Sequence, residues 1–424
     1  MSIQDLRFVD FWVGLPLTWL LTLVRKAFGW LPAGAASSKK ILFIKFSEQG
    51  STVIARQIIQ TAADTYGRDN VFFVVFKDNK EILSILDLIP EKNILTIKTR
   101  SLWNVAWDLT RVLWRSWTSR IDTVIDLEFT SRASALLAFL SGARKRVGFF
   151  TFFDEGPYRG DLFTHRVQFN PHFHTVILYH ILFTSHKADA SQLPLTKFSL
   201  KDFSVVSPPQ LKFSNDECHQ VLTVVESELH AKLHPSDTVI VLNANASDLV
   251  PIRKWPEAHF VELAQRLLAA YPKAYLLFTG NRQEAAFTEK MVQSLGMPRV
   301  ASLAGKLSLR QFVTLLSLSD LLVSNDSGPA HFSSLTDVHR IVLFGPETPD
   351  LFSPLGENLS VIYEARSCSP CVSAYNHRHS RCTDNVCMKS ISVEQVFMKV
   401  QEVLTRGNSQ DGREDRKFLK AASE

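Results

Sequence analysis

The sequence has few cysteines, little excess charge and no hydrophobic run of clear membrane-spanning length. Five of the 424 residues are Cys, and the net charge is +5 at pH 7. An excess this small suits an anionic ligand or an acidic membrane surface. It does not indicate a nucleic-acid partner, and we find no nucleic-acid-binding module. No cleavable signal peptide is recognisable, so we expect a cytoplasmic protein without structural disulfides.

The composition is that of a folded chain. Apolar residues make up 46% and charged residues 21% of the sequence, which excludes an extended disordered protein. At roughly 100–200 residues per domain, the length predicts two or three domains.

An apolar segment lies close to the N-terminus. Residues 11–24 read FWVGLPLTWLLTLV, and two cations follow them. Fourteen residues are fewer than the ~20 needed to cross a bilayer, and Trp12 and Trp19 favour the headgroup region. The pattern indicates a monotopic anchor whose cations face anionic lipid; a helix packed on the protein body is the alternative. We assign residues 1–38 to this segment and a linker.

From residue 39 onward, short apolar runs alternate with amphipathic stretches. The first half contains expected strands at 41–46, 71–76, 93–97 and 123–127 and expected helices at 52–66, 81–88 and 102–117. The second half contains expected strands at 238–243, 274–279, 321–324 and 340–344 and expected helices at 256–270, 282–295, 309–318 and 327–335. Continuously apolar strands that alternate with helices are typical of a parallel sheet covered on both faces.

The sequence therefore predicts an α/β protein with two Rossmann-like, doubly wound domains facing a cleft. The pattern weakens around 196–213, so we place the domains at 39–200 and 201–405. The polar residues 406–424 are expected to be a disordered tail. Ligands of such sheets bind beyond the carboxyl ends of the strands.

Three loops at such strand ends could carry chemistry. In 325–331, NDSGPAH, Ser327 is a candidate N-cap and the free N–H groups of the helix start would attract a diphosphate; an ordinary capped helix is the alternative. In 244–256, Arg253 and Lys254 could neutralise a departing phosphate, or they could form a solvated basic turn. In 47–52, Glu48 is a plausible general base for an acceptor hydroxyl, or a surface residue.

Four cysteines form a cluster near the C-terminus. They could hold a structural zinc ion, but the spacing of the second pair is wider than in a typical knuckle, and a reduced, packed loop is the alternative. The zinc candidates are Cys368, Cys371, Cys382 and Cys387.

Taken together, these motifs resemble glycosyltransferase family nine, the ADP-heptose:lipopolysaccharide heptosyltransferases. The similarity extends from about residue 40 to 403 and follows the family order in segments 45–51, 124–149, 164–167, 254–260, 303–306, 325–331 and 343–346. Each segment is a weak signal, whereas the ordered set is specific.

The resemblance implies an inverting transfer of GT-B type that requires no metal or other cofactor. The donor would be ADP-heptose, bound mainly by the second domain. The acceptor would be a lipopolysaccharide core or a related, lipid-linked glycan, bound mainly by the first domain at the inner face of the cytoplasmic membrane. The implied donor-binding residues are Ser247, Lys254, Glu284, Asp326, Ser327, Gly328 and His331, with Arg253 at the diphosphate. The implied acceptor-binding residues are Gly50, Ser51, Arg132, Arg144 and Arg146.

One position departs from the family pattern. The family has Asp directly after the loop glycine, and that Asp is taken as the base, whereas this sequence has Ser51. Glu48 in the same loop could replace it. Two alternatives stay open: a transferase or epimerase of the same fold that uses a UDP-sugar, and a membrane-attached protein that binds nucleotide or glycan without catalysis.

Overall fold

The computed structural model describes residues 3–28, 38–152, 156–191, 197–201, 203–246, 250–376 and 378–409. It divides the chain into two compact units. The first unit comprises Met1–Val206 and Ser373–His379, and the second comprises Ser207–Val372 and Ser380–Glu424. The return of seven residues from the cysteine-containing region to the first unit has no counterpart in the sequence pattern.

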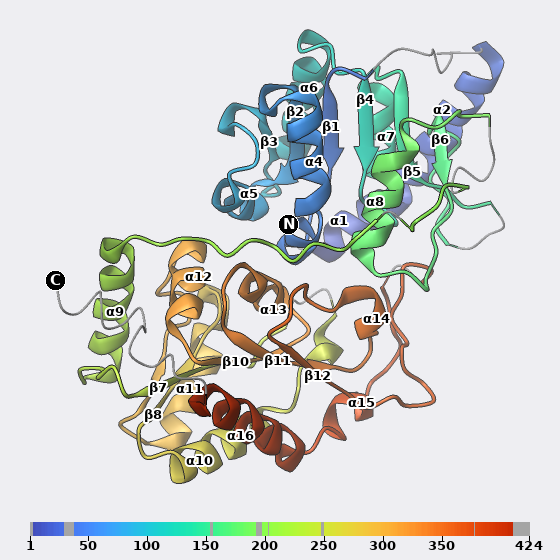
Figure 1. The fold of residues 1–424 in the computed structure, drawn as a ribbon. Coiled ribbons are helices and arrows are strands. Elements are labelled where there is room, and N and C mark those ends of the chain that lie inside the picture. Colours follow the sequence, from blue (N-terminus) through green and yellow to red (C-terminus); the bar gives the residue numbers. More distant parts are fainter. Residues whose placement is uncertain are drawn as a thin grey trace. The chain divides into compact units, whose positions relative to one another are not determined.

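The first unit is built on one sheet with helices on both faces (Figure 1). Its elements are α1 (Ile3–Val9), the π-helical turn η1 (Asp10–Gly14), α2 (Leu15–Phe28), β1 (Ile41–Ile44), α3 (Gln49–Ile54), α4 (Arg56–Tyr66), η2 (Arg68–Asn70), β2 (Val71–Phe76), η3 (Lys77–Asn79), α5 (Lys80–Leu86), η4 (Glu91–Asn93), β3 (Ile94–Ile97), α6 (Leu102–Thr118), β4 (Thr123–Asp126), α7 (Arg132–Leu140), β5 (Lys145–Phe149), β6 (His165–Val167) and α8 (Thr175–Ser185).

All strand pairs of this sheet are parallel, in the order β3-β2-β1-β4-β5-β6. This is the doubly wound order, in which the winding reverses between β1 and β4. The four expected strands are confirmed. The sequence missed β5, which starts with two cations and contains a glycine, and β6, which has three residues.

Side chains of the strands alternate between two helical layers, as the pleat requires. Leu42 and Ile44 of β1 face a core shared with α6, α7 and Leu21 of α2. Phe43 points the other way, where its ring lies 6.3 Å from that of Phe183 in α8. The helices α6, α7 and α2 therefore belong to one layer on a single face of the sheet.

The second unit repeats this architecture. Its elements are α9 (Asn215–Leu229), β7 (Thr238–Asn243), η5 (Pro251–Arg253), α10 (Glu257–Ala270), β8 (Ala274–Phe278), η6 (Arg282–Glu284), α11 (Ala285–Leu295), β9 (Val300–Ser302), α12 (Leu309–Leu318), β10 (Leu321–Asn325), α13 (Gly328–Phe332), η7 (Ser333–Leu335), β11 (His339–Phe344), α14 (Pro349–Phe352), β12 (Leu359–Tyr363), α15 (Val386–Lys389) and α16 (Val393–Ser409). The sheet order is β12-β11-β10-β7-β8-β9, again parallel throughout, with the reversal between β7 and β10.

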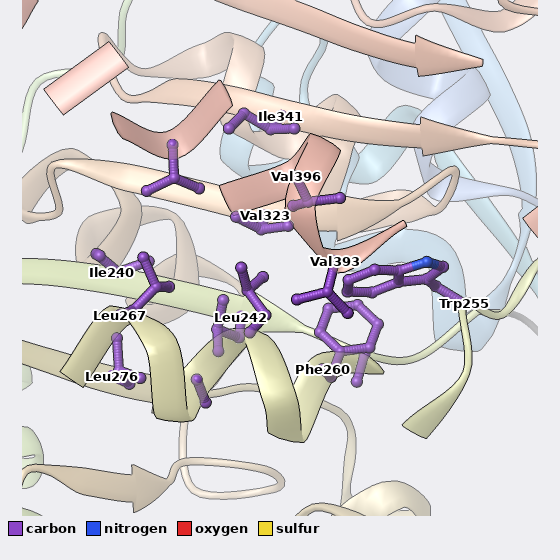
Figure 2. Close-up of a cluster of buried hydrophobic side chains, with 14 of the residues drawn as sticks. Ile240, Leu242, Trp255, Phe260, Leu267, Leu276, Val323, Ile341, Val393 and Val396 are labelled. Carbon is purple, nitrogen blue, oxygen red and sulfur yellow. The ribbon is translucent and has the colours of Figure 1, made fainter. Parts of the chain in front are cut away.

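The largest core of this unit lies between the sheet and helices α10, α11 and α16. Figure 2 shows Trp255 beside Phe260 and Val393 within it. The indole is 2% exposed, its ring centroid lies 4.9 Å from that of Phe260, and its Nε1–H donates to the Ile391 carbonyl at 2.9 Å. Trp255 thus fixes the loop that carries Arg253 and Lys254.

The C-terminal boundary differs from the expectation. Residues 406–409 belong to α16 and not to a tail, while residues 410–424 lie outside the described part of the chain. Residues 32–37 of the expected linker, 32–38, lie outside it as well.

The N-terminal helices α1, η1 and α2 pack on the rest of the first unit through several polar contacts, besides the core contact of Leu21. The Asp10 carboxylate accepts hydrogen bonds from the backbone N–H of Ala133 at 2.8 Å and of Arg132 at 3.2 Å, which are free donors at the start of α7. The Thr22 hydroxyl accepts from the Asp161 N–H at 2.9 Å, and Arg25 pairs with the same aspartate at 2.5 Å. The alternative of a helix packed on the body is therefore realised for this face of the segment.

The helical segment is longer than the apolar run 11–24 from which it was predicted. Asp5–Ala27 forms a continuous stretch of 23 residues that is long and apolar enough to cross a membrane by length and composition, and 17% of its most apolar window is buried in the protein. The sequence underestimated its length because Asp10 and Gly14 interrupt the apolar pattern but not the helix.

Replacing Asp10 with Ala should destabilise the first unit by about 1–2 kcal/mol, because two helix-start N–H groups of α7 lose their acceptor. At about 2–4 °C per kcal/mol, the thermal midpoint should fall by a few degrees, and proteolysis between α2 and β1 should accelerate. Asp78→Ala is the matched control, since Asp78 is exposed and its side chain caps no helix. Equal midpoints for the two variants would contradict the capping role.

Candidate active site

In each unit, two loops leave neighbouring strands at the point where the strand order reverses. In the first unit these are the loops after β1 and β4, and in the second they follow β7 and β10. Loops at such a switch point diverge to opposite faces of the sheet and leave room for a ligand.

In the first unit, Lys45 and Glu128 bridge the two loops. Lys45 Nζ lies 3.1 Å from Glu128 Oε2, and the Phe46 N–H donates to Glu128 Oε1 at 2.7 Å. Lys45 is 1% exposed, so its charge depends on this partner. A second carboxylate, Glu48, lies 3.5 Å from Lys45 Nζ.

Glu48 has a strained backbone and a crowded carboxylate. Its φ of 71° lies in the left-handed region, where a non-glycine residue is uncommon. The carboxylate accepts from the Ser51 hydroxyl at 3.1 Å and also pairs with Arg378, which comes from the segment 373–379. The structure thus brings Glu48 and Ser51 together. Gly50 lies buried in the first turn of α3 beside them.

Two further buried groups lie next to this cluster. Tyr179 of α8 is completely buried near Lys45 and Ser51, and burial raises the pKa of its phenol to about 12. Burial also raises the pKa of Asp126 to about 6, although the paired Arg159 guanidinium counteracts the shift. The sequence analysis missed Arg159, whose loop shows no motif.

An aromatic pocket adjoins the half-site at the carboxyl ends of β4, β5 and β6. The rings of Phe129 and Phe149 stack at 5.2 Å, Phe169 contacts both edge-on, and Tyr375 meets Phe169 at 5.4 Å. The residues that line the pocket are Phe129, Phe149, Phe150, Thr151, Pro157, Arg159, Gln168, Phe169, Ala374 and Tyr375. Aromatic faces with a few polar groups suit a sugar or another flat, partly apolar ligand.

The three arginines expected to bind the acceptor are not gathered here, which corrects that expectation. Arg144 and Arg146 lie at the amino end of β5, at the edge of the parallel sheet opposite to Glu48. Arg146 is fully buried and donates to the Leu162 and Ala143 carbonyls. Arg132 lies at the correct edge, but its guanidinium binds the Tyr158 carbonyl and Asp10. Arg132 and Arg146 thus hold the fold of the unit, whereas Arg144 is exposed.

In the second unit, Asn325 at the end of β10 organises the half-site. Its Nδ2 donates to the Ala244 carbonyl at 3.0 Å and to the Asn245 carbonyl at 3.2 Å, and its Oδ1 accepts from the Trp255 N–H at 3.0 Å. Asn385 holds the same loop from the other side through the carbonyls of Ile252 and Lys254. One buried amide therefore positions the loop with Arg253 against β10.

Arg253 lies between two carboxylates. Its Nη1 is 3.3 Å from Asp326 Oδ2 and 3.3 Å from Glu347 Oε2, and all three side chains are at most 7% exposed. Burial raises the pKa of Glu347 to about 8, against the opposing effect of Arg253. Glu347 was not among the predicted site residues, although it follows the Gly-Pro pair at the end of β11, a strand-end position like those of the predicted residues.

The helix start at Ser327 differs from the expectation in one respect. Ser327 precedes α13, but its hydroxyl does not cap the helix and donates instead to the Asn325 carbonyl at 3.1 Å. Gly328 begins the helix and His331 is buried in it. Ser327, Gly328 and His331 therefore lie beside Asp326 as predicted, with a different role for the serine hydroxyl.

Several polar atoms at this edge are buried without a hydrogen-bond partner among the described residues. They include Arg253 Nε, Asn243 Oδ1 and Asn245 Oδ1. Most buried polar atoms in proteins are paired, so such a group of atoms marks a place where a ligand or water would complete the contacts.

The remaining predicted donor residues surround this edge. Glu284 follows β8, where its carboxylate accepts from the Asn281 N–H at 2.7 Å as part of a capping box. Lys254 is partly exposed next to Arg253. Ser247 lies outside the described residues.

The four cysteines were candidates for a zinc site, with a reduced, packed loop as the alternative. Among the described residues, no group of three or more His, Cys, Asp or Glu side chains is placed to hold a metal ion. Cys371 Sγ lies 3.3 Å from the Ser380 hydroxyl and Cys382 Sγ lies 3.1 Å from the Asp384 carbonyl oxygen. Cys387 is buried, which raises the pKa of its thiol.

Comparison with known proteins identifies relatives. The family model of glycosyltransferase family 9 (heptosyltransferase) matches residues 110–380, well over half of the chain. Lipopolysaccharide heptosyltransferase 2 of Salmonella typhimurium is 31% identical over 115 residues, which are 26% of this chain and 32% of that protein. Lipooligosaccharide heptosyltransferase 2 of Campylobacter jejuni is 23% identical over 219 residues, which are 46% of this chain and 67% of that protein. The chain thus spans about a third of the length of the first of these relatives.

Solved structures show the same fold. The E. coli ADP-heptose lipopolysaccharide heptosyltransferase II superposes with a TM-score of 0.65 at 19% identity, covering 87% of this chain and 100% of that one. The E. coli heptosyltransferase WaaC with ADP superposes with a TM-score of 0.54 at 18% identity, covering 86% of this chain and 99% of that one. These likenesses confirm the predicted fold class of two Rossmann-like domains of GT-B type.

Replacing Glu347 with Gln should flatten the dependence of stability on pH. The folded-state pKa of about 8 lies above the ordinary value of 4.5. Between these pH values Glu347 is ionised in the unfolded chain and protonated in the folded chain. The free energy of unfolding therefore falls as pH rises from about 4.5 to about 8, and this contribution is constant at higher pH. A pKa difference of even one unit corresponds to about 1.4 kcal/mol.

The measurement is the thermal midpoint from pH 5 to 9, in which the advantage of Glu347→Gln over the unaltered protein should grow by several degrees toward pH 8. Glu357→Gln is the control, because Glu357 is exposed. Parallel curves for Glu347→Gln and the unaltered protein would show that this carboxyl titrates normally.

Proposed function

The chain belongs to glycosyltransferase family 9, and from this premise we propose that it transfers a heptose from ADP-heptose to a lipopolysaccharide core or a related lipid-linked glycan. The second unit binds the donor and the first unit binds the acceptor. The single observation that carries the donor half of this proposal is the group of buried, unpartnered polar atoms around Arg253 at the β7/β10 switch point.

The chemistry of that edge suits a nucleoside diphosphate. The unpartnered Nε of Arg253 can donate to a phosphate oxygen, and Lys254 adds a second cation nearby. The acceptor oxygens of Asn243 and Asn245 can take hydrogen bonds from ribose or base donors. Glu284, at the end of the neighbouring strand β8, is proposed to face the ribose. A relative whose solved structure contains ADP shares this fold.

The two carboxylates beside Arg253 are proposed to make donor binding depend on pH. Near neutral pH, Glu347 with its raised pKa carries a proton, so the cluster of Arg253 and Asp326 is close to neutral. An entering diphosphate would then meet a cluster without net negative charge. Donor affinity should therefore weaken at high pH, where Glu347 ionises and repels the diphosphate.

In the first unit, Glu48 is the proposed base. It has the strained backbone that often accompanies a functional position, and it lies at the switch point within contact of Ser51, the residue that replaces the family's aspartate. Lys45 and Arg378 fix the carboxylate in one orientation. The adjoining aromatic pocket is proposed to hold a sugar ring of the acceptor.

The proposed reaction is an inverting displacement. The acceptor hydroxyl attacks the anomeric carbon opposite the departing ADP, a new glycosidic C–O bond forms, and the C–O bond to the diphosphate breaks. Glu48 takes the hydroxyl proton. Arg253 and Lys254 stabilise the charge that grows on the diphosphate, so the step is proposed to need no metal and to proceed in the presence of a chelator.

The proposed location is the cytoplasmic face of the membrane. The N-terminal helix presents Trp12, Trp19 and other large apolar residues to the outside while its polar residues contact the body. Such an arrangement suits a helix that lies in the interface and brings the enzyme to a lipid-linked acceptor.

The donor assignment is tested by the thermal shift that ADP, UDP, GDP and CDP each produce at millimolar concentration. ADP should raise the midpoint most; a ligand at 100 times its Kd adds about 2.7 kcal/mol. Arg253→Lys should reduce the ADP shift, whereas exposed Arg381→Lys should leave it unchanged. A shift confined to UDP would favour a UDP-sugar transferase or epimerase, and no shift with any nucleotide would favour a non-catalytic protein.

The base assignment is tested by Glu48→Gln. Loss of a general base should lower kcat on the order of 10²–10⁴-fold, with donor affinity nearly unchanged because the donor binds the other unit. Ser51→Ala is the matched control; it removes the hydroxyl that contacts Glu48 and should change kcat far less. Unchanged turnover in Glu48→Gln would remove Glu48 from the base role.

A further inference from the structure

Tryptophan is distributed unevenly over the molecule. Of the eight tryptophans in the sequence, Trp255 is buried, and six others in the described part of the chain are more than half exposed. Two of the six, Trp12 and Trp19, lie in the N-terminal helix. The remaining four are on α6: Trp103, Trp107, Trp114 and Trp117. Large aromatic side chains on a soluble surface lose the free energy that burial would provide, so their grouping on one helix calls for a partner.

Helix α6 is apolar on two opposite faces. The tryptophans at 103, 107, 114 and 117 are separated by four, seven and three residues, which places them on one face. Their exposed fractions run from 53% at Trp117 to 76% at Trp103. Val105, Val112 and Leu109 lie on the opposite face and pack into the core beneath the sheet. The core of the unit uses the second face.

The exposed charged residues of the segment that contains α6 are all cations. Residues 98–120 contain five cations, Lys98, Arg100, Arg111, Arg115 and Arg120, all exposed. The only acid in this range, Asp108, is 2% exposed and accepts from the Lys98 N–H at 2.9 Å. Arg111 pairs with this buried aspartate at 3.2 Å, and the other four cations are exposed. An exposed face of tryptophans in a segment whose exposed charges are cations complements an anionic surface whose interior is apolar.

The same helical layer contains the N-terminal helix. Helix α7 contacts α6 and also α2 and η1, and all three helices cover one face of the sheet. Their outer surfaces therefore look away from that face. Leu140 at the end of α7 is 43% exposed, and its carbonyl accepts from Trp117 Nε1 at 3.0 Å. The exposed apolar residues of α2, α7 and α6 are thus parts of one side of the unit.

We propose that the tryptophan face of α6 is a lipid-binding surface, which together with the N-terminal helix lays the first unit on an anionic phospholipid bilayer. The indoles enter the headgroup region and the flanking arginines contact lipid phosphates. Two separated contacts fix the orientation of the unit on the membrane, which one helix cannot do. This inference concerns lipid binding and does not depend on the proposed transfer reaction.

The test is flotation of the full-length protein with vesicles of phosphatidylcholine alone or mixed one-to-one with phosphatidylglycerol. The unaltered protein should bind the mixed vesicles more strongly, and less so at high salt. The variant Trp103→Gln/Trp107→Gln/Trp114→Gln, with its N-terminal helix intact, should bind on the order of tenfold more weakly. The control Met297→Gln/Val386→Gln/Met398→Gln removes exposed apolar residues from the second unit and should bind like the unaltered protein.

A second variant separates loss of contact from loss of folding. Trp103→Phe/Trp107→Phe/Trp114→Phe should keep most of the vesicle binding, while quenching of the remaining tryptophan fluorescence by brominated lipid falls. A glutamine variant that binds as tightly as the unaltered protein would overturn the proposal and leave the N-terminal helix as the anchor. Failure of the unaltered protein to bind any vesicle would also overturn it, as would a tryptophan-dependent dimer in sedimentation without vesicle binding. Nucleotide-induced thermal shifts, measured in parallel, report the donor site independently.

Discussion

The reversal of strand order in each sheet is the constraint on which both half-sites depend. Helices that leave β1 and β4, or β7 and β10, go to opposite faces, so the loops between them cannot cover the strand ends. Parallel strands also align their carboxyl ends at this one edge. Side chains at this edge are enclosed by neighbouring loops and not by a layer of helices. In both sheets, buried ion pairs occupy the edge: Lys45 with Glu128 in the first and Arg253 with Asp326 in the second.

Burying these charges costs free energy of desolvation, and the two half-sites compensate for it differently. Removing an ion from water costs several kcal/mol unless its partners replace the hydration shell. In the first unit, Lys45 faces Glu128 at 3.1 Å and Glu48 at 3.5 Å, so its charge is fully matched. In the second, Arg253 has two carboxylates but leaves Nε unpartnered, and the pKa of one carboxyl is raised to about 8. An incompletely satisfied cluster of this kind gains most from a ligand that brings its own negative charge.

The sequence predicted the architecture better than the sites. Long, continuously apolar strands such as 71–76 and helices such as 309–318 have a clear period and were found, whereas β5 and β6 are short or polar and were not. Motif order placed Glu48, Arg253 and Asp326 at the correct edge, because loops after parallel strands must meet there. Arg146 of β5 was misassigned because sequence spacing does not tell which end of a strand a residue occupies, nor that its guanidinium binds backbone carbonyls. Glu347 and the return of residues 373–379 depend on contacts between distant segments, which no local pattern encodes.

The first unit also shows an inversion of the usual helix pattern. In α2, Thr18 and Thr22 are buried against the body, while Trp19, Leu20 and Leu23 of the same helix are exposed. A helix whose outer face meets water gains free energy by the opposite arrangement. The inward contacts include hydrogen bonds and an ion pair, such as the Asp161 N–H on Thr22 and Arg25 with Asp161, beside the apolar contact of Leu21 with the core. Polar contacts of this kind fix the helix in one position and leave its apolar face outward, which is the arrangement a soluble body needs if it is to present hydrophobic surface to a lipid phase without losing its own core.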